Sequence, residues 1–195
     1  TEEKLRDNAR RAGLTLASVV EGALFLLLGR ITDRNDIIVG TTVSGRPPDV
    51  PGVENMIGMF INTLPVRMTV DRDTPLTDWL STLQSRLAAV QERSESALTH
   101  LRVWADQPAS ATLFETIFVF ENYPVSKSLN EHEENLHISE VQVSESTGYP
   151  LTIVATPQEG LTLKAIADTG YFSAAALRRF LANYRALLES IAEHP

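Results

Sequence analysis

Histidine is the side chain that most often supplies acid–base catalysis near neutral pH or binds a metal, and here the histidines are few and scattered. The four are His100, His132, His137 and His194. No two are adjacent or four residues apart, the spacing that places two ligands on one face of a helix. The chain has no cysteine and therefore offers no thiolate ligand. The sequence predicts no metal site.

Recognisable catalytic motifs are also missing. The sequence contains no Walker A loop, no G-x-G-x-x-G and no G-x-S-x-G. A Ser-His-Asp triad assembled in space stays open, because triads are recognised by geometry and not by sequence order. His132 and His194 are expected to be solvated, whereas His100, between Leu98 and Leu101, is expected to be partly buried. We assign no catalytic residue to the chain.

Three segments instead combine polar side chains with strand-like apolar residues. They are residues 43–48 (Val-Ser-Gly-Arg-Pro-Pro), 57–67 (Ile-Gly-Met-Phe-Ile-Asn-Thr-Leu-Pro-Val-Arg) and 118–124 (Phe-Val-Phe-Glu-Asn-Tyr-Pro). A buried polar side chain in a strand needs a hydrogen-bond partner. On residue types alone a structural role is the better founded interpretation: Asn62 would satisfy a bulge near Pro65, and Asn122 would form a local turn.

The helices that would position these segments follow from apolar residues at three- and four-residue spacing. Thr15 and Ser173 are expected N-caps, and Thr74 is expected to cap a helix whose first turn contains Pro75. The expected helices cover residues 1–12, 15–31, 74–97, 98–104 and the segment from 174 to near the C-terminal end. The second of these is expected to be buried nearly all round, because apolar residues occupy most of its faces.

Runs of β-branched and aromatic residues predict the strands. The expected strands are 36–44, 59–70, 113–120, 136–143, 151–156 and 161–167, the last two joined by a hairpin turn. Pro65 cannot donate to a ladder, so its strand is expected at a sheet edge or a bulge. Helices and strands do not alternate strictly, which favours an α/β fold with a mixed sheet over a parallel doubly wound sheet.

Composition excludes some classes of partner. The 195 residues include 17 Lys+Arg and 25 Asp+Glu, for a formal net charge of −8. This balance disfavours a nucleic-acid or anionic-membrane partner, because each phosphate contact needs a Lys or Arg. The first residues, Thr-Glu-Glu-Lys, do not resemble a signal peptide, and the apolar run 23–28 is too short to span a bilayer. The absence of cysteine fits a reducing compartment, so we expect a cytoplasmic protein.

Taken together, the polar-bearing segments resemble the condensation domains of non-ribosomal peptide synthetases. Residues 57–67 are similar to that family's late core motif, an Ile/Val-Gly-x-Phe-x-Asn-Thr pattern followed by Pro and Arg. Residues 36–48 are similar to the strand before it and to its Gly-Thr-x-x-Ser-Gly-Arg-Pro loop. Residues 118–124, Tyr149-Pro150-Leu151 and Tyr171-Phe172 resemble later family segments. The match runs over essentially the whole chain in the family's order.

The resemblance covers half of the family's domain. In the family, two chloramphenicol-acetyltransferase-like lobes form a V, and the N-terminal lobe carries a His-His-x-x-x-Asp-Gly motif whose second histidine is the usual catalytic candidate. This sequence contains no His-His pair. Residues 1–195 are therefore similar to the C-terminal lobe alone, and the implied fold is a chloramphenicol-acetyltransferase-like α/β lobe with a mixed sheet flanked by helices.

The function that the resemblance implies is amide bond formation. In the family, the amine of an acceptor aminoacyl thioester attacks a donor thioester in a tunnel between the lobes. Phosphopantetheine arms of donor and acceptor peptidyl carrier proteins hold both substrates, so no cofactor is expected to be bound directly. The implied partners are these carrier proteins, the N-terminal lobe and an adjacent adenylation domain. The motifs are closer to domains that accept an L-configured donor than to epimerisation domains.

The resemblance also implies roles for particular residues. Asn62 and Thr63 would line or brace the tunnel, and Asn122 and Ser44 would lie on its substrate side. Asn122 would reach the tunnel or hydrogen-bond a pantetheine arm. Asn and Thr do not titrate, so none of these residues is assigned as a general base.

Two arginines are candidates for an ion pair between the lobes. Arg67 is expected to be buried in its apolar strand and to pair with the Asp of the histidine motif in the other lobe, with Arg46 as the second candidate. By position, residues 45–58 resemble the family's floor loop, and the segment between 122 and 150 resembles the latch that crosses to the other lobe.

Two other functions stay open on the sequence. The chain could be a non-catalytic scaffold that packs against adenylation and carrier domains through its last helix. It could also be a complete small acyltransferase with its own base, for which His100 is the candidate.

Overall fold

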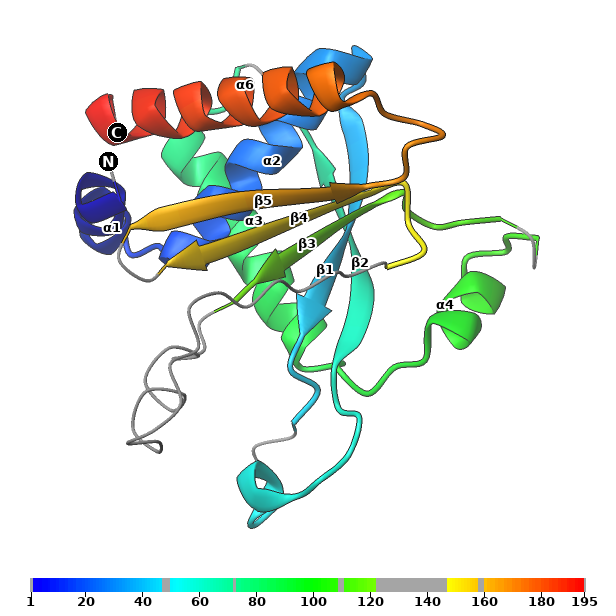
Figure 1. Cartoon of the computed structure of the whole chain (residues 1–195). Helices are drawn as coiled ribbons and strands as arrows, with labels where there is room; N and C mark the ends of the chain where they lie inside the picture. Colours follow the sequence, from blue (N-terminus) through cyan, green and yellow to red (C-terminus); the bar gives the residue numbers. More distant parts are fainter. Residues whose placement is uncertain are drawn as a thin grey trace, which may run out of the picture.

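The computed structural model describes residues 2–46, 50–71, 73–108, 111–121, 147–157 and 160–194, apart from the side chain of Glu54. Five strands of this part of the chain form one sheet in the order β2-β1-β3-β4-β5 (Figure 1). They are β1 (Asp36–Val43), β2 (Asn62–Thr69), β3 (Thr116–Phe120), β4 (Leu151–Pro157) and β5 (Leu161–Ala167).

The sheet is mixed, as predicted. β1 pairs antiparallel with β2, and β4 pairs antiparallel with β5, whereas β3 runs parallel to both of its neighbours. β2 is an edge strand, so the prediction for Pro65 is confirmed. Its register with β1 is continuous, with Pro65 opposite Gly40, and no bulge interrupts it.

Helices cover one face of this sheet. α2 (Leu16–Thr32), α3 (Leu76–Gln91) and α6 (Ala174–Glu193) pack there, and α1 (Glu2–Arg11) contacts α2 and α6 (Figure 1). α2 lies at the centre and is buried over most of its length, as predicted. A shorter helix, α4 (Leu98–Trp104), lies away from this layer. The predicted N-caps are confirmed, because Thr15 accepts from the amide of Ser18 and Ser173 from that of Ala176.

Alternation along the strands sorts their side chains onto two faces. Val39, Val66 and Ile153 face the helices and belong to the hydrophobic core. Thr42 and Thr63 stand opposite each other in the register and, by parity, occupy the helix-free face together with Arg67. Thr63 and Arg67 therefore lie on the side of β1 and β2 that the described helices leave free, whereas Asn62 shares the parity of Leu64 and Val66 and points to the side of α3.

Several predicted boundaries are corrected. β2 begins at Asn62 and not at 59, because its partner β1 ends at Val43 and the chain then turns at Gly45. β3 begins at Thr116 and not at 113, because it joins β1 only from Ile117. α3 ends at Gln91 and not at 97, and turns follow it. The predicted strand 136–143 lies outside the described residues.

The expected Thr74 cap is wrong. Pro75 occupies the N-cap position of α3 without a side-chain hydrogen bond, and the helix begins at Leu76. The hydroxyl of Thr74 donates instead to Asp71 Oδ2 at 2.7 Å. Thr74 therefore belongs to the turn that precedes the helix, where its hydroxyl is bonded to Asp71.

One carboxyl group lies inside the core. Glu21 of α2 is 2% exposed, and the hydroxyl of Thr41 on β1 donates to its Oε1. Next to it, Tyr184 of α6 donates its hydroxyl to the carbonyl oxygen of Val20 at 2.6 Å. Burial raises the pKa of Glu21 to about 8, and the bond from Thr41 acts in the opposite direction. The carboxyl is therefore mostly neutral at pH 7.

Within the described residues, no single helix is long and apolar enough to cross a bilayer. α1 and α2 meet the length and composition criteria only as a pair, and they are bent by 104° at their junction.

Candidate functional site

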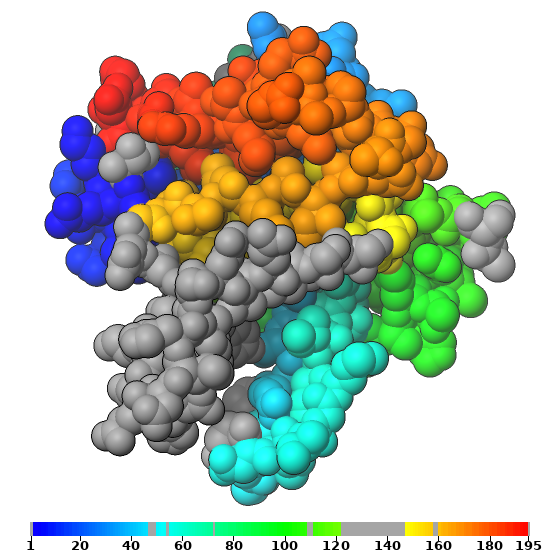
Figure 2. Space-filling view, in the orientation of Figure 1, coloured from blue at the N-terminus to red at the C-terminus, as the bar shows by residue number. Residues whose placement is uncertain are grey.

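The candidate site residues gather around the helix-free face of β1 and β2 and the loop that joins these strands. The described residues of this loop, 44–46 and 50–61, project from the body of the molecule (Figures 1 and 2). Ser44 is exposed at its start, and Asn62 and Thr63 follow its end. The structure brings Ser44, Arg46, Asn62 and Thr63 together at the loop end of β1 and β2, whereas Arg67 lies toward the opposite end of the ladder, near Asp36. Asn122 lies outside the described residues.

Asn62 ties the start of β2 to the turns that follow α3. Its Nδ2 donates to the carbonyl oxygens of Ser94 and Ser96, both at 2.8 Å, and its Oδ1 accepts from the amide of Thr63 at 2.9 Å. Both amide hydrogens are thereby used. The predicted role at a bulge near Pro65 is wrong, because the ladder is regular there and the side chain braces two distant segments.

Hydroxyl groups line the helix-free face beside this brace. The Oγ1 atoms of Thr42 and Thr63 lie 3.4 Å apart across the β1/β2 ladder, and either can be the donor. Both side chains are half-buried, and Ser44 is exposed beyond the end of β1. Hydroxyls can donate and accept, so this row can bind amide or carbonyl groups of a ligand but cannot act as a base near neutral pH.

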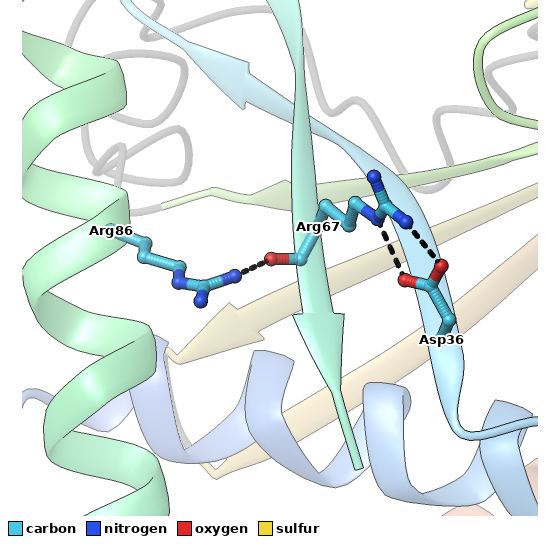
Figure 3. Close-up of polar contacts among 3 residues, drawn as sticks. All are labelled: Asp36, Arg67 and Arg86. Carbon is cyan, nitrogen blue, oxygen red and sulfur yellow. Dashed lines mark hydrogen bonds and ion pairs between the residues drawn. The ribbon is translucent and has the colours of Figure 1, made fainter.

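Arg67 already has a carboxylate partner within the chain. Its Nε donates to Asp36 Oδ1 at 2.8 Å and its Nη2 to Asp36 Oδ2 at 2.6 Å, a bidentate pair across β1 and β2 (Figure 3). The bond from Arg67 lowers the pKa of Asp36, and Asp36 raises the pKa of Arg67. Arg86 of α3 donates to the carbonyl oxygen of Arg67 and so covers part of the β2 edge.

The expected burial of Arg67 is corrected. Its side chain is 68% exposed and that of Asp36 is 50% exposed, because both project from β1 and β2 on the face without described helices. The sequence suggested a buried guanidinium from the apolar residues on either side of Arg67. Those neighbours, Val66 and Met68, face the helices, so alternation turns Arg67 outward.

Arg46 lies inside the projecting loop. Its Nη1 donates to the carbonyl oxygens of Val53 and Met56, the latter at 3.2 Å, and its guanidinium carbon lies 4.4 Å from the centre of the Phe60 ring. Val53 is the first residue of a short 3₁₀ turn, η1 (Val53–Asn55), and Met56 directly follows it. Both hydrogen bonds of the side chain go to backbone carbonyls of the loop.

Sequence reasoning missed Phe114 and Tyr149 as a pair. Their rings stack with centres 5.3 Å apart and planes at 12°. Phe114 lies against Gly40 of β1, where a Cβ would collide with the ring. The available signal was Gly40 itself, because a glycine inside a β-branched strand often marks a close approach by another group.

Acid–base groups are sparse around this face. His100 is exposed on α4, so its expected partial burial is wrong, and its ring lies 6.1 Å from that of Trp104. Among the residues described by the structure, no group of three or more His, Asp or Glu side chains could hold a metal ion. Described site residues offer hydrogen bonding and a positive charge.

The comparisons with known proteins decide the family. A model of the condensation domain matches residues 1–195. The chain belongs to the condensation-domain family. A linear gramicidin synthase protein of Brevibacillus parabrevis is 42% identical over 194 residues, and the match covers 100% of this chain and 4% of the relative. The resemblance to domains of non-ribosomal peptide synthetases is thereby confirmed.

Solved structures of the family share the fold. The condensation domain of the monacolin K polyketide synthase superposes with a TM-score of 0.79 at 18% identity, over 100% of this chain and 45% of that one. A four-domain nonribosomal peptide synthetase bound to AMP and glycine gives 0.84 at 18% identity, over 100% of this chain and 16% of that one. The predicted chloramphenicol-acetyltransferase-like fold is confirmed. This chain spans less than half of each matched structure and a small part of the synthetase relative.

Proposed function

We propose that residues 1–195 act as the C-terminal lobe of a condensation domain, forming one wall of a tunnel in which two carrier-bound thioesters are joined by an amide bond. The observation that carries this proposal is the coverage: all of this chain matches 45% of a solved condensation domain. The sheet face that the described helices leave free and the projecting loop of β1 and β2 support it, since both offer surface to a second lobe.

The two lobes would contribute different groups to the reaction. The acceptor amine attacks the donor thioester carbonyl, the carbon–sulfur bond breaks, the thiol of the donor arm leaves, and the amine loses a proton. Asn62, Thr63 and Ser44 cannot accept that proton near neutral pH. A base must therefore come from outside this set, and the N-terminal lobe with its His-His-x-x-x-Asp-Gly motif is the proposed source.

The described residues fit positioning roles in this tunnel. Asn62 would brace the wall from behind, while the hydroxyls of Thr63 and Ser44 would face the substrates. Arg67 would meet the Asp of the histidine motif through Nη1, since its pair with Asp36 uses Nε and Nη2. Asn122 stays a prediction for the substrate side.

The proposed partners follow from the same assignment. They are the N-terminal lobe, donor and acceptor peptidyl carrier proteins that hold the substrates on phosphopantetheine, and an adjacent adenylation domain, all in the cytoplasm. Support comes from the synthetase relatives and from a solved neighbour that is a four-domain synthetase. No cofactor held by the lobe itself is part of the proposal.

A scaffold function is the second candidate, and one groove favours it. The groove lies between α1, β5 and α6, has a volume of about 580 Å³, and has a largely apolar lining. Its lining includes Leu5, Leu161, Leu163, Leu181 and Leu188. A lobe that only packed against neighbouring domains through α6 would use this surface and would leave the helix-free sheet face without a catalytic task.

Reconstitution from separately produced lobes distinguishes the two functions. This chain, a separately produced N-terminal lobe and aminoacyl-loaded donor and acceptor carrier proteins are combined, and amide product is followed by mass spectrometry. The proposal expects product only when both lobes are present, and none when the second histidine of the motif is replaced. Product from this chain alone, lost in His100→Ala, would instead support a complete small acyltransferase. Unchanged product without this chain would support the scaffold.

A further inference from the structure

The loop between β1 and β2 has an internal organisation that the family assignment does not explain. Compact surface loops with close ends are commonly packed by their own side chains. Among the described residues of 50–61, Val53 is the buried apolar side chain, whereas Ile57 and Met59 are fully exposed and Ile61 is largely exposed. Apolar packing within this part of the loop is therefore sparse, and a polar side chain is needed to hold its shape.

Arg46 is this polar side chain. A single nitrogen, Nη1, donates to the carbonyl oxygens of Val53, the first residue of η1, and of Met56, which directly follows η1. These carbonyls belong to one turn, so the side chain gathers the tip of the loop toward its base. Hydrogen bonds from a charged donor are among the stronger ones in proteins.

The same guanidinium is seated on an aromatic ring at the other end of the loop. Its central carbon lies 4.4 Å from the centre of Phe60, within the range of a cation–π interaction. Lysine would not reproduce this arrangement, because only the planar guanidinium can rest on the ring and donate sideways at once.

Gly45 closes the base of the loop. It has a φ of +61°, and a Cβ at this position would collide with the carbonyl oxygen of Phe60. The backbone entering the loop therefore touches the backbone leaving it, directly beside Arg46. Base, tip and Phe60 all meet at this one side chain.

We propose that Arg46 is a positioning residue that holds the described residues of the loop between β1 and β2, 44–46 and 50–61, in one arrangement. In this arrangement Ile57 and Met59 are directed outward and contact the second lobe. This inference deepens the proposed function and rests on it for the identity of the contacted surface. It gives Arg46 a role within its own loop in place of an ion pair between the lobes.

Amide hydrogen exchange tests the positioning role without any reaction. The amides of Val53, Asn55 and Met56 donate within the loop, at 3.2, 3.0 and 3.3 Å. Arg46→Gln should speed their exchange about tenfold, the effect expected for losing a hydrogen bond from a charged donor. Exchange in β1 and β2 should not change. Arg46→Lys should give an intermediate rate, which a loss of charge alone would not produce.

Arg10→Gln is the matched control. It removes the same charge from an exposed helix position, where the side chain pairs with Asp7. This variant should leave exchange in the loop unchanged. If loop exchange in Arg46→Gln matches that of Arg10→Gln, or if β1 and β2 exchange faster to the same extent as the loop, the proposal is overturned.

Amide formation by the combined lobes then tests the outward contact. Arg46→Gln should lower kcat/KM about tenfold relative to Arg10→Gln, in line with the loss of one such interaction. Faster loop exchange with unchanged amide formation overturns the contact with the second lobe. If the unmodified lobes form no amide, the proposed function fails, while the exchange result still decides the role of Arg46.

Discussion

The two faces of the sheet are stabilised in different ways. On the helix-covered face, apolar side chains of β1, β2 and β4 pack against α2, α3 and α6 and are almost fully buried. On the other face, single polar contacts set the geometry, the Thr42–Thr63 pair and the Arg67–Asp36 pair, and the Asn62 brace does so at the start of β2. Burial of apolar area therefore fixes the fold, whereas directional contacts shape the candidate site.

The largest change in stability is expected from a substitution in the buried core. Leu24 of α2 is fully buried in the core, so Leu24→Ala should lower the free energy of unfolding by about 3–4 kcal/mol. Ile57→Ala removes a similar side chain from the exposed loop and should change it by less than about 0.5 kcal/mol. Urea denaturation followed by circular dichroism measures both. Equal losses in the two variants would contradict the contrast between core and loop.

The next effect concerns the carboxyl inside the core. The pKa of Glu21 is about 8 in the folded chain and close to 4.5 when unfolded. A raised folded-state pKa stabilises fully below pH 4.5, and this contribution is lost as the pH rises through 8. Glu21→Gln lacks this loss and can still accept from Thr41. It should therefore be more stable than the parent chain by of the order of 2–3 kcal/mol near pH 7.

Denaturation midpoints at several pH values measure this difference. The advantage of Glu21→Gln should be smallest near pH 5, should grow to about pH 8 and should then level off. A constant difference between the two proteins over this range would show that the carboxyl is not neutral in the core. Glu189→Gln serves as a control, since that side chain is 39% exposed on α6 and pairs with Arg185.

A smaller effect is expected at the Asn62 brace. Asn62→Ala leaves the carbonyls of Ser94 and Ser96 without their donor and should cost about 2 kcal/mol. Thr63→Val, which removes only the long contact to Thr42, should cost less than about 1 kcal/mol. Thermal melting of both variants tests the order. A larger loss for Thr63→Val would show that the hydroxyl pair of Thr42 and Thr63 stabilises the start of β2 more than Asn62 does.

The sequence predicted the helix-covered side better than the polar side, for a physical reason. Apolar periodicity is a local signal, so α2, α6 and the hairpin of β4 and β5 could be placed from neighbouring residues. Asn62 bonds to carbonyls more than thirty residues away, and Arg67 reaches Asp36 across two strands. Such partners depend on the finished fold, so residue types identified the right side chains without their contacts.

The Arg46 loop shows the same limit at short range. Residues 45–58 matched the family's loop by position, whereas Phe60 was predicted to lie in the strand that follows. No periodic signal indicates that an arginine will rest on a phenylalanine ring while bonding two carbonyls. Turn residues predict where a chain bends, and the side chain that holds the bend is known only from the structure.

The smallest effect is expected at Arg67, where the structure changes the expectation from sequence. A buried, unpaired partner would make Arg67→Ala strongly destabilising, but both side chains of the Arg67–Asp36 pair are largely exposed. In this chain Arg67→Ala should shift the denaturation midpoint only slightly, and the coupling with Asp36→Asn in a double-mutant cycle should weaken as salt is added. In the combined lobes the same substitution should slow amide formation, with Arg67→Lys restoring part of it, if Nη1 meets the other lobe's aspartate. A large, salt-independent loss of stability in this chain alone would show that Arg67 contributes to folding as a buried core residue does.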